Sequence, residues 1–433
     1  MWNNTTYNQC EHSIYESCTH QSEFTAEELE TARVWLQNKM LEADIKPRGK
    51  PCETLYVRKD FKCMSNRERL EFIRVIRVLY EKGIMDRFAG IHARYWAEVH
   101  KTAQLGPWHR WFVNELEKQM RIINPKITIP YYNAQLDASR PEKSMVWRYL
   151  GQHGVHNTGF CVTDGPLYGK LDLNWCVKRQ WGPNGTIPAI DGLELNTIWL
   201  QLSPSFLIAN FIQSGLHFNT HLAFGGYRGD MSVDTAPIDI QFYLWHNYQM
   251  NIMMLKFQLQ DRRYLTPLDY RTVPNVNQET GLLESVDLGV DQLIYYKTPV
   301  VDVFHVGYGD LCSVPDQIVS AINQVVRNET IVPLAVKRMP FLVKFKLFPK
   351  FLSKNFSPFV HSFEEVGNCN RECRPIPQFQ PYVSTQNGKR QLARYYYDEN
   401  FNVKPVLIAS QAFHSLAIKY MNALGYCSPY VTS

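Results

Sequence analysis

The chain has 433 residues, 45% of them apolar and 13% aromatic, a composition typical of an ordered globular protein. A chain of this length can bury a large core, which excludes extensive disorder apart from the tails. The net charge of +5 is spread along the chain, so we infer neither a nucleic-acid-binding surface nor a surface for acidic substrates.

The N-terminal part is expected to hold a polar extension followed by two amphipathic helices. Residues 1–58 carry three cysteines and one helical stretch, EFTAEELETARVWLQNKM, and we interpret them as an extension tied down by disulfides. From Ser65 a capping serine, with Glu68 three residues later, precedes apolar residues at helical spacing. The segment 109–120 places His109 on the apolar face of a second helix, after a turn at Pro107.

Between residues 150 and 205 glycine, proline and asparagine are frequent, which predicts a long irregular excursion. Two histidine-bearing helices are expected after it. One runs through 205–221, and the other starts after Pro237, with Asp239 as its N-cap, and continues to Phe257. The fold class that follows is mainly α with long loops.

Helical periodicity fades after residue 262, so we expect a helical domain over 59–262 and an additional, mostly β or irregular C-terminal region over 263–433. The segment 341–348, FLVKFKLF, alternates apolar and lysine residues as a half-buried strand does, although the basic run 337–354 would also suit a membrane surface. Whether this region is structural or covers the functional site stays open. No uninterrupted apolar run approaches the ~18 residues of a membrane span, so none is predicted.

The cysteines and sequons favour a protein of the secretory route. Ten cysteines, none in a C-x-x-C spacing, indicate disulfides rather than a zinc or redox site. N-glycosylation sequons begin at residues 3, 4, 184, 328 and 355. The N-terminus MWNNTTYNQC has no apolar h-region, so we expect any signal peptide to have been removed already. A secreted or extracellular location is therefore predicted.

Six of the thirteen histidines lie on or beside the expected helices, in two groups of three. His217 and His221 are four residues apart in GLHFNTH, so one helical face presents both imidazoles. His246, in QFYLWHNYQM, belongs to an inward-facing stripe of the next helix and joins them if the two helices pack antiparallel. The other group consists of His92, His100 and His109.

A single buried histidine is more often a core residue bonded to a carbonyl than a metal ligand. Two all-histidine triads without a carboxylate or thiolate companion change that balance. Neutral imidazole is a good copper ligand, whereas hard cations prefer oxygen, so copper is expected and zinc stays chemically possible. His153 and His156, in the glycine-rich stretch GQHGVHNTG, are interpreted as solvated.

Two stretches of the chain match a known pattern. The first is His100 followed by GPWHRWFVNELE and ITIPYYN, and the second is LHFNTH with FGGYRGDM and APIDIQFYLWH. Together they resemble the copper motifs of the tyrosinase, catechol oxidase and molluscan haemocyanin superfamily, over roughly residues 60–260, and GFCVTDGPLYGK is similar to the excursion between the motifs. Glu117 matches a glutamate of the first motif, although a solvated or paired surface acid is an equal interpretation on so charged a helix.

The resemblance implies an antiparallel four-helix bundle that holds two copper ions. The first ion would be bound by His92, His100 and His109, and the second by His217, His221 and His246. No catalytic residue is assigned beyond these ligands. The substrate pocket or the surroundings of the ligands would include Phe218, Leu222, Phe242, Asp239 and Trp245.

The activity that this resemblance implies is that of a secreted dicopper oxidase. It would convert catechols, and monophenols as a further candidate, to o-quinones with O2, for pigmentation or oxidative cross-linking. The substrate would be a small phenol or catechol, or a tyrosine or DOPA side chain of a protein.

Four departures from the family pattern leave alternatives open. Phe218 stands where tyrosinases carry asparagine, and FLIANFIQSGLH offers no upstream glutamate, so hydroxylation of monophenols is not assured. Ile240 replaces a proline, Trp245 replaces the non-ligand member of a histidine pair, and Met250 with Asn251 replaces an Asp-Arg pair. A tyrosinase-related metal-binding protein with altered or lost phenol oxidase activity, or an oxygen carrier, are the other interpretations.

Overall fold

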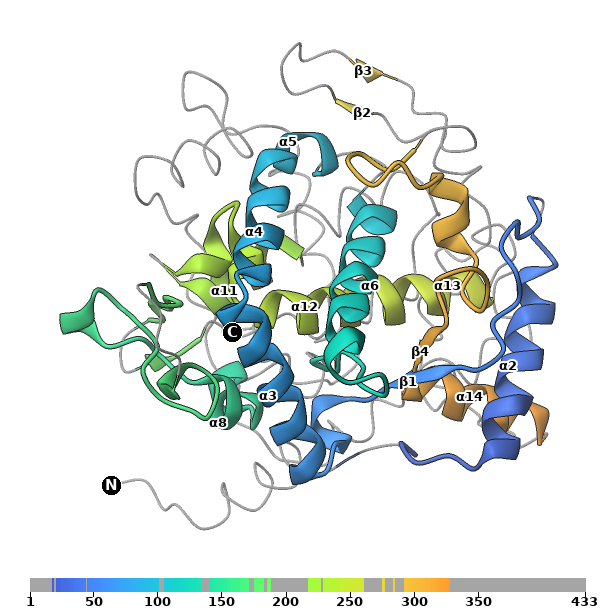
Figure 1. The fold of residues 1–433 in the computed structure, drawn as a ribbon, viewed down its shortest axis with the longest axis horizontal. Coiled ribbons are helices and arrows are strands. Elements are labelled where there is room, and N and C mark those ends of the chain that lie inside the picture. The colour runs from blue at the N-terminus through green and yellow to red at the C-terminus, as the bar shows by residue number, and fades with distance from the viewer. Residues whose placement is uncertain are drawn as a thin grey trace, which may run out of the picture.

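The computed structural model describes residues 18, 21–43, 45–100, 105–133, 137, 140–170, 175–182, 185–187, 217–226, 229–260, 275–276, 283–284 and 292–327. Over these residues the fold is mainly helical, as the sequence predicts (Figure 1). The α-helices are α2 (Ala26–Met40), α3 (Asn66–Glu81), α4 (Ile84–Arg94), α5 (Trp96–Val99), α6 (Leu105–Ile123), α8 (Val146–Leu150), α11 (Phe218–Gly225), α12 (Gln241–His246), α13 (Met254–Gln260) and α14 (Asp316–Val326).

Side-chain capping explains where the N-terminal helices begin. At α3 the Ser65 hydroxyl accepts the Glu68 backbone N–H at 3.2 Å, and the Glu68 carboxylate accepts the Ser65 N–H at 2.7 Å. This is the capping box that the sequence predicts, and it satisfies two backbone donors that a helix end otherwise leaves open. Thr25 and Glu28 form the same motif at α2.

Helix α6 begins earlier than the sequence indicates. It starts at Leu105, so Pro107 lies inside its first turn, where a missing N–H costs no hydrogen bond. His109 is consequently held within a helix of nineteen residues. Before it, α4 ends at Arg94 and the four residues of α5 lead into His100, whose backbone is extended.

The helix expected from Asp239 to Phe257 is divided into three parts. α12 ends at His246, a π-helix covers Asn247–Met253, and α13 follows. Asp239 accepts the Gln241 N–H at 3.0 Å, although the N-cap residue is Ile240. Most of the preceding predicted helix, residues 205–216, lies outside the described residues.

Strands are short in the described part of the chain. β1 (Tyr56–Arg58) pairs in parallel with β4 (Ser313–Pro315), and β2 (Asn275–Val276) pairs antiparallel with β3 (Leu283–Glu284). The segment 341–348, expected as a strand, lies outside the described residues. In the C-terminal region, residues 292–327 are described over the longest continuous stretch, and they contain α14.

The structure has three disulfides among the described residues, Cys18–Cys63, Cys52–Cys312 and Cys161–Cys176, which span 45, 260 and 15 residues. All cysteines of the described residues are paired. Such bridges are consistent with an extracellular protein, because they persist in oxidising environments. Among the described helices, none has both the length and the apolar character needed to cross a membrane.

The main core lies between α3, α4, α6 and α12. In Figure 1 α4 and α6 run beside each other, and the run from α12 to α13 passes behind α6. The rings of Phe88 on α4 and Phe112 on α6 meet at 5.1 Å, and Tyr243 on α12 stacks on Phe112 at 5.8 Å. A second cluster packs α14 against α2. The six histidines of the two groups lie in or directly beside α4, α5, α6, α11 and α12, and all six are buried.

Candidate metal centre

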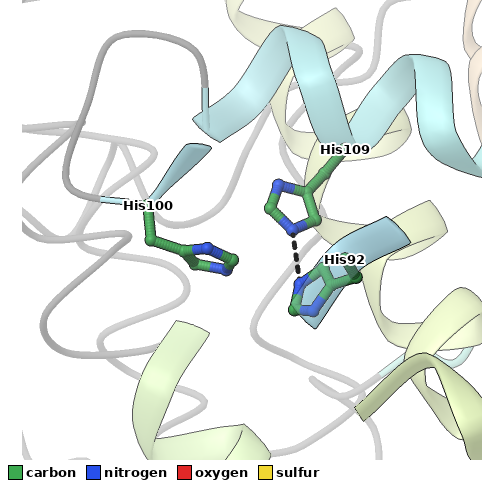
Figure 2. A group of neighbouring side chains, drawn as sticks. All are labelled: His92, His100 and His109. Carbon is green, nitrogen blue, oxygen red and sulfur yellow. Dashed lines mark hydrogen bonds between the residues drawn. The ribbon is translucent and has the colours of Figure 1, made fainter. Parts of the chain in front are cut away.

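The first histidine triad comes from three consecutive helical segments. His92 lies in the last turn of α4, His100 follows α5, and His109 lies in α6. Figure 2 shows the three imidazoles turned toward one another, and one ring nitrogen of each lies within 4.8 Å of the others. All three are buried, with at most 4% of their surface exposed. The structure thus brings these three histidines together as a group, as expected from the sequence.

The second group lies against the first. His217 immediately precedes α11, His221 lies within it, and His246 is the last residue of α12. The Nε2 atom of His246 is 3.4 Å from that of His217 and 3.1 Å from that of His221. His109 also falls within 4.8 Å of His217 and His246, so it borders both groups. Two buried triads that meet in this way are typical of a dicopper centre.

Backbone carbonyls orient several of these rings. The Nδ1 atoms of His100 and His109 donate to the carbonyls of Trp96 and Leu105, each at 2.8 Å. Each carbonyl lies four residues before its histidine, so the helical segment that carries the ring also orients it. With the proton on Nδ1, the Nε2 lone pair points into the space between the helices.

The turn between α11 and α12, residues 229–239, orients one ring of each triad. The carbonyl of Asp234 accepts from Nδ1 of His92, and the carbonyl of Met231 accepts from Nδ1 of His221 at 2.8 Å. One short segment therefore connects the surroundings of the two triads. A sequence gives no signal for such a role, because every residue has a carbonyl.

The positions of the Nε2 atoms show whether these histidines fit a metal ion. Nε2 of His92 lies 3.4 Å from Nε2 of His109, and both rings carry their proton on Nδ1. Two lone pairs face each other at that distance, which is unfavourable unless a cation lies between or beside them. A donor set of neutral imidazoles suits copper, and the residues present therefore fit a dicopper site.

Burial keeps these imidazoles neutral. It lowers the pKa of His92 to about 3 and that of His221 to about 4. In each case the hydrogen bond to a backbone carbonyl raises the pKa, but burial has the larger effect. Burial also lowers the pKa of His100, His109 and His246, and neighbouring histidines lower it further. A neutral imidazole has a free lone pair, which is the form that binds metal.

Phe242 packs at the centre of both triads. Its ring centroid lies 4.1 Å from that of His246 and 5.1 Å from that of His92, and it is fully buried. The rings of His109 and His221 lie at 5.9 and 5.6 Å. One aromatic side chain thus contacts four of the six imidazoles, limits their rotation and excludes water.

Asp239, at the start of α12, belongs to a buried charged network. Its two carboxylate oxygens accept from Nε and Nη2 of Arg179 at 2.7 and 2.8 Å, and both side chains are fully buried. Arg179 also donates to the carbonyls of Leu150 and Gly151, and Asp239 accepts from the Tyr168 hydroxyl at 3.2 Å. The irregular excursion is thereby fixed to the helix that ends in His246.

The other predicted residues are placed as follows. Leu222 is buried in α11, next to His221. Trp245 is fully buried, and its ring lies against those of Phe224 and Tyr248. Phe218 is the first residue of α11, and its side chain lies outside the described set.

The two loop histidines differ from each other. His156 is exposed, as predicted. His153 is half-buried, and its Nδ1 accepts the Trp181 N–H at 3.0 Å, so the expectation that it is solvated is wrong.

Glu117 is not a surface acid. It is fully buried on α6, and its carboxylate accepts from Nε of Arg58 at 2.8 Å and from Nη2 of Arg121 at 2.5 Å. Burial would raise its pKa, but the two guanidinium groups lower it, and the Ser313 hydroxyl and the Ile129 N–H also donate to it. Arg58 and Ser313 are distant from Glu117 in sequence, so helix periodicity alone could not reveal this burial.

Comparisons with known proteins agree with this geometry. The model of the common central domain of tyrosinase matches residues 82–254, a range that contains all six histidines. These residues belong to the tyrosinase family of type-3 copper proteins. The resemblance inferred from the copper motifs is therefore confirmed for this type-3 copper domain.

Relatives of the type-3 copper domain come from several kingdoms. A tyrosinase-like protein of Caenorhabditis elegans is 27% identical over 213 residues, which are 44% of this chain and 29% of the relative. The tyrosinase of Streptomyces lincolnensis is 29% identical over 192 residues, 39% of this chain and 66% of that protein. Grixazone synthase of Streptomyces griseus is 25% identical over 152 residues, 32% of this chain and 48% of that protein. The chain thus spans less than two thirds of each of these relatives.

Among solved structures, that of a polyphenol oxidase variant from Thermothelomyces thermophila is similar to this chain. It has 18% sequence identity and a TM-score of 0.47, over 67% of this chain and 97% of that one.

Proposed function

We propose that the protein is a secreted dicopper oxidase that converts catechols to o-quinones with O2. The observation that carries the proposal is the convergence of six buried, neutral imidazoles, which form three Nε2–Nε2 pairs at 3.4, 3.4 and 3.1 Å. Relatives with the names tyrosinase and grixazone synthase support an oxidative reaction of phenols. The three disulfides support an extracellular location.

The ligands would be the six histidines. We assign the first copper to His92, His100 and His109 and the second to His217, His221 and His246. When bound, the two ions together supply the transfer of electrons from substrate to O2, so that two catechols and one O2 give two o-quinones and two waters.

The residues of this chain prepare the site for that chemistry. The carbonyls of Leu105, Trp96, Asp234 and Met231 hold a proton on Nδ1 of four rings, which leaves Nε2 free to coordinate. Phe242 fills the space between the triads and keeps water from the ring nitrogens. The protein thus supplies orientation and a dry environment.

Catechols are the preferred substrate class in this proposal. Phe218 follows His217, where a monophenol-hydroxylating tyrosinase is expected to carry asparagine. The substrate would be a small catechol or phenol, or a tyrosine or DOPA side chain of a protein, in pigmentation or cross-linking. We place the reaction in residues 59–262, which would form an antiparallel four-helix bundle, with 1–58 as a disulfide-tied extension and 263–433 as a mostly β or irregular C-terminal region that would cover the active site.

A histidine exchange tests the proposal with a matched control. His246→Ala is expected to lower catechol turnover by at least about 100-fold, because even residues that only orient a ligand cost 10- to 100-fold. The control is His156→Ala, since His156 is exposed on the excursion. Oxygen uptake with a catechol should be lost in the first variant and kept in the second. An active His246→Ala protein that is still folded would show that the ligand assignment is wrong.

A second candidate is a tyrosinase-related protein that binds metal without oxidising phenols. Phe218, Trp245 and Met250 favour it, because each replaces the residue type of the family pattern. Native protein that holds zinc and is inert toward catechols would support this candidate. Release of bound O2 at low pressure without quinone formation would instead indicate an oxygen carrier.

A further inference from the structure

Arg110, the residue after His109, connects the helices that carry the two triads. Its side chain is fully buried. Nε donates to the carbonyl of Met250 at 3.1 Å, and Nη1 donates to Oε1 of Gln258 at 3.0 Å and to the carbonyl of Val303 at 3.1 Å. A single side chain of α6 is therefore bonded to the helical segment after His246 and to residues 300–304.

The carbonyl that Arg110 binds lies in an unusual stretch of backbone. The π-helix Asn247–Met253 begins directly after His246, and Met250 is at its middle. A π-turn is rarer than an α-turn and is found often at functional sites. It needs support from outside the helix, and a charged donor on one of its carbonyls is a strong form of such support.

The two histidines next to these bonds are in contact. The rings of His109 and His246 stack with centroids 4.5 Å apart and an interplanar angle of 20°. His109 precedes Arg110 by one residue, and His246 precedes Met250 by four. The hydrogen bond between Arg110 and Met250 thus connects α6, one residue after His109, to the helical backbone four residues after His246.

Gln258 extends this connection on the far side. Its Nε2 donates to the carbonyl of Phe304 at 2.8 Å, while its Oε1 accepts from Arg110. Val303 and Phe304 belong to the 3-10 segment Val300–Phe304, whose four apolar side chains are buried and which is in contact with α6. Arg110 is consequently held from two directions, and its planar guanidinium is a rigid spacer between helices.

We propose that Arg110 is a positioning residue that sets the separation of His109 and His246, and with it the fit of the two metal positions to each other. The proposal rests on the proposed function only in that both histidines bind copper. Arg110 itself acts through the backbone of the π-helix and does not touch substrate or metal.

Two variants of Arg110 and one matched control test this proposal. Arg110→Met removes the bonds to the two carbonyls and to Gln258, and Arg110→Lys keeps the charge but loses the planar fork. Arg69→Met is the control, because Arg69 is also a buried arginine that donates to two carbonyls, those of Phe61 and Lys62, at 3.0 and 2.9 Å. Arg69 lies on α3, and its other hydrogen-bond partners are Tyr149 and Met145.

Three quantities are measured for each protein: copper ions per chain, the rate of copper loss to a chelator, and the thermal unfolding temperature without metal. The near-ultraviolet absorption after addition of hydrogen peroxide gives a fourth readout. We expect both methionine variants to lower the unfolding temperature, whereas only Arg110→Met should lose copper about 10-fold faster and show a shifted or weakened band. Arg110→Lys should lie between Arg110→Met and the wild type.

The outcomes separate this proposal from the proposed function. If Arg110→Met keeps copper and the near-ultraviolet band as Arg69→Met does, Arg110 is only a structural residue and the proposal is overturned. If the wild type holds two copper ions but does not oxidise catechols, the proposed function fails while the copper retention of the Arg110 variants still decides the role of Arg110. A wild type that holds no copper overturns both.

Discussion

The two triads differ in what holds their imidazoles in place. In the first, the rings of His92, His100 and His109 all donate to backbone carbonyls. In the second, among the described residues, a backbone carbonyl accepts from Nδ1 of His221, whereas Nδ1 of His246 has no hydrogen-bond partner there. The first triad is therefore fixed by backbone, and the second depends on packing and on side chains around α12.

This difference indicates where the site is most easily disturbed. A backbone carbonyl cannot be removed by substitution, so the orientation of the first triad is protected from most single changes. The second triad relies on the Asp239 and Arg179 pair before α12 and on the π-helix after His246, whereas Phe242 contacts both triads. Changes of Asp239 or Arg179 should act on the second metal position before the first.

The largest effect is expected at the buried ion pair before α12. Arg179→Met leaves the carboxylate of Asp239 buried without its cation, and breaking such a pair costs about 3–5 kcal/mol. The free energy of unfolding of the metal-free protein, measured with denaturant, should fall by this amount. The double variant Arg179→Met with Asp239→Asn should recover part of the loss, because the uncompensated charge is gone. A loss below about 1 kcal/mol in the single variant would show that the pair does not hold α12.

The next effect concerns a buried histidine outside both triads. Burial lowers the pKa of His305 to about 4, although Asp302 raises it. The unfolded chain takes up a proton near pH 6.5 while the folded protein stays neutral, so stability is complete above that pH and is lost as the pH falls from 6.5 to 4.

His305→Gln should remove this part of the pH dependence, at most about 3 kcal/mol, from the unfolding free energy of the metal-free protein. The titration is followed by denaturant unfolding from pH 8 to pH 4, with the wild type as the reference. Curves that run parallel for the two proteins would contradict the assignment. A weaker pH dependence in His305→Gln would show which part of the loss of stability in acid comes from His305 and which part comes from the triads.

A smaller effect on stability is expected at Phe242. Phe242→Leu keeps an apolar side chain and should cost about 1 kcal/mol, but it removes the flat ring between the triads. Copper should then be lost to a chelator about 10-fold faster. Phe72→Leu, an equally buried exchange on α3, is the control for packing alone. Equal copper retention in both variants would show that Phe242 fills space without orienting the rings.

The smallest expected effect is a difference between the two triads in which ring nitrogen carries the proton, and its measurement needs no substitution. Nitrogen-15 NMR of the metal-free protein reports which ring nitrogen carries the proton. His92, His100, His109 and His221 should be protonated on Nδ1, whereas His246 should show a mixture of both forms. A single, fixed Nδ1-protonated form at His246 would mean that both triads are equally preorganised.

Helices and histidines could be predicted because their signals are local. The capping box at Ser65 and Glu68 lies within four residues, and the spacing of His217 and His221 is one helical turn. The mainly helical fold and the copper motifs follow from such patterns. The division of the helix after His246 could not be predicted, because over seven residues a π-turn has nearly the same apolar pattern as an α-turn.

The parts that sequence reasoning missed depend on partners far apart in the chain. Glu117 is buried because Arg58 and Ser313 reach it from β1 and β4. Asp239 is paired with Arg179 from the irregular excursion. Periodicity describes one element at a time, so it gives the face of a helix but not the charge that another segment brings to it.

The central claim is most directly tested by the metal content of the native protein. Metals are counted by mass spectrometry, and the near-ultraviolet spectrum is recorded before and after addition of hydrogen peroxide. The account predicts two copper ions per chain and a new near-ultraviolet band. Zinc in their place, or less than one metal ion per chain, would contradict it.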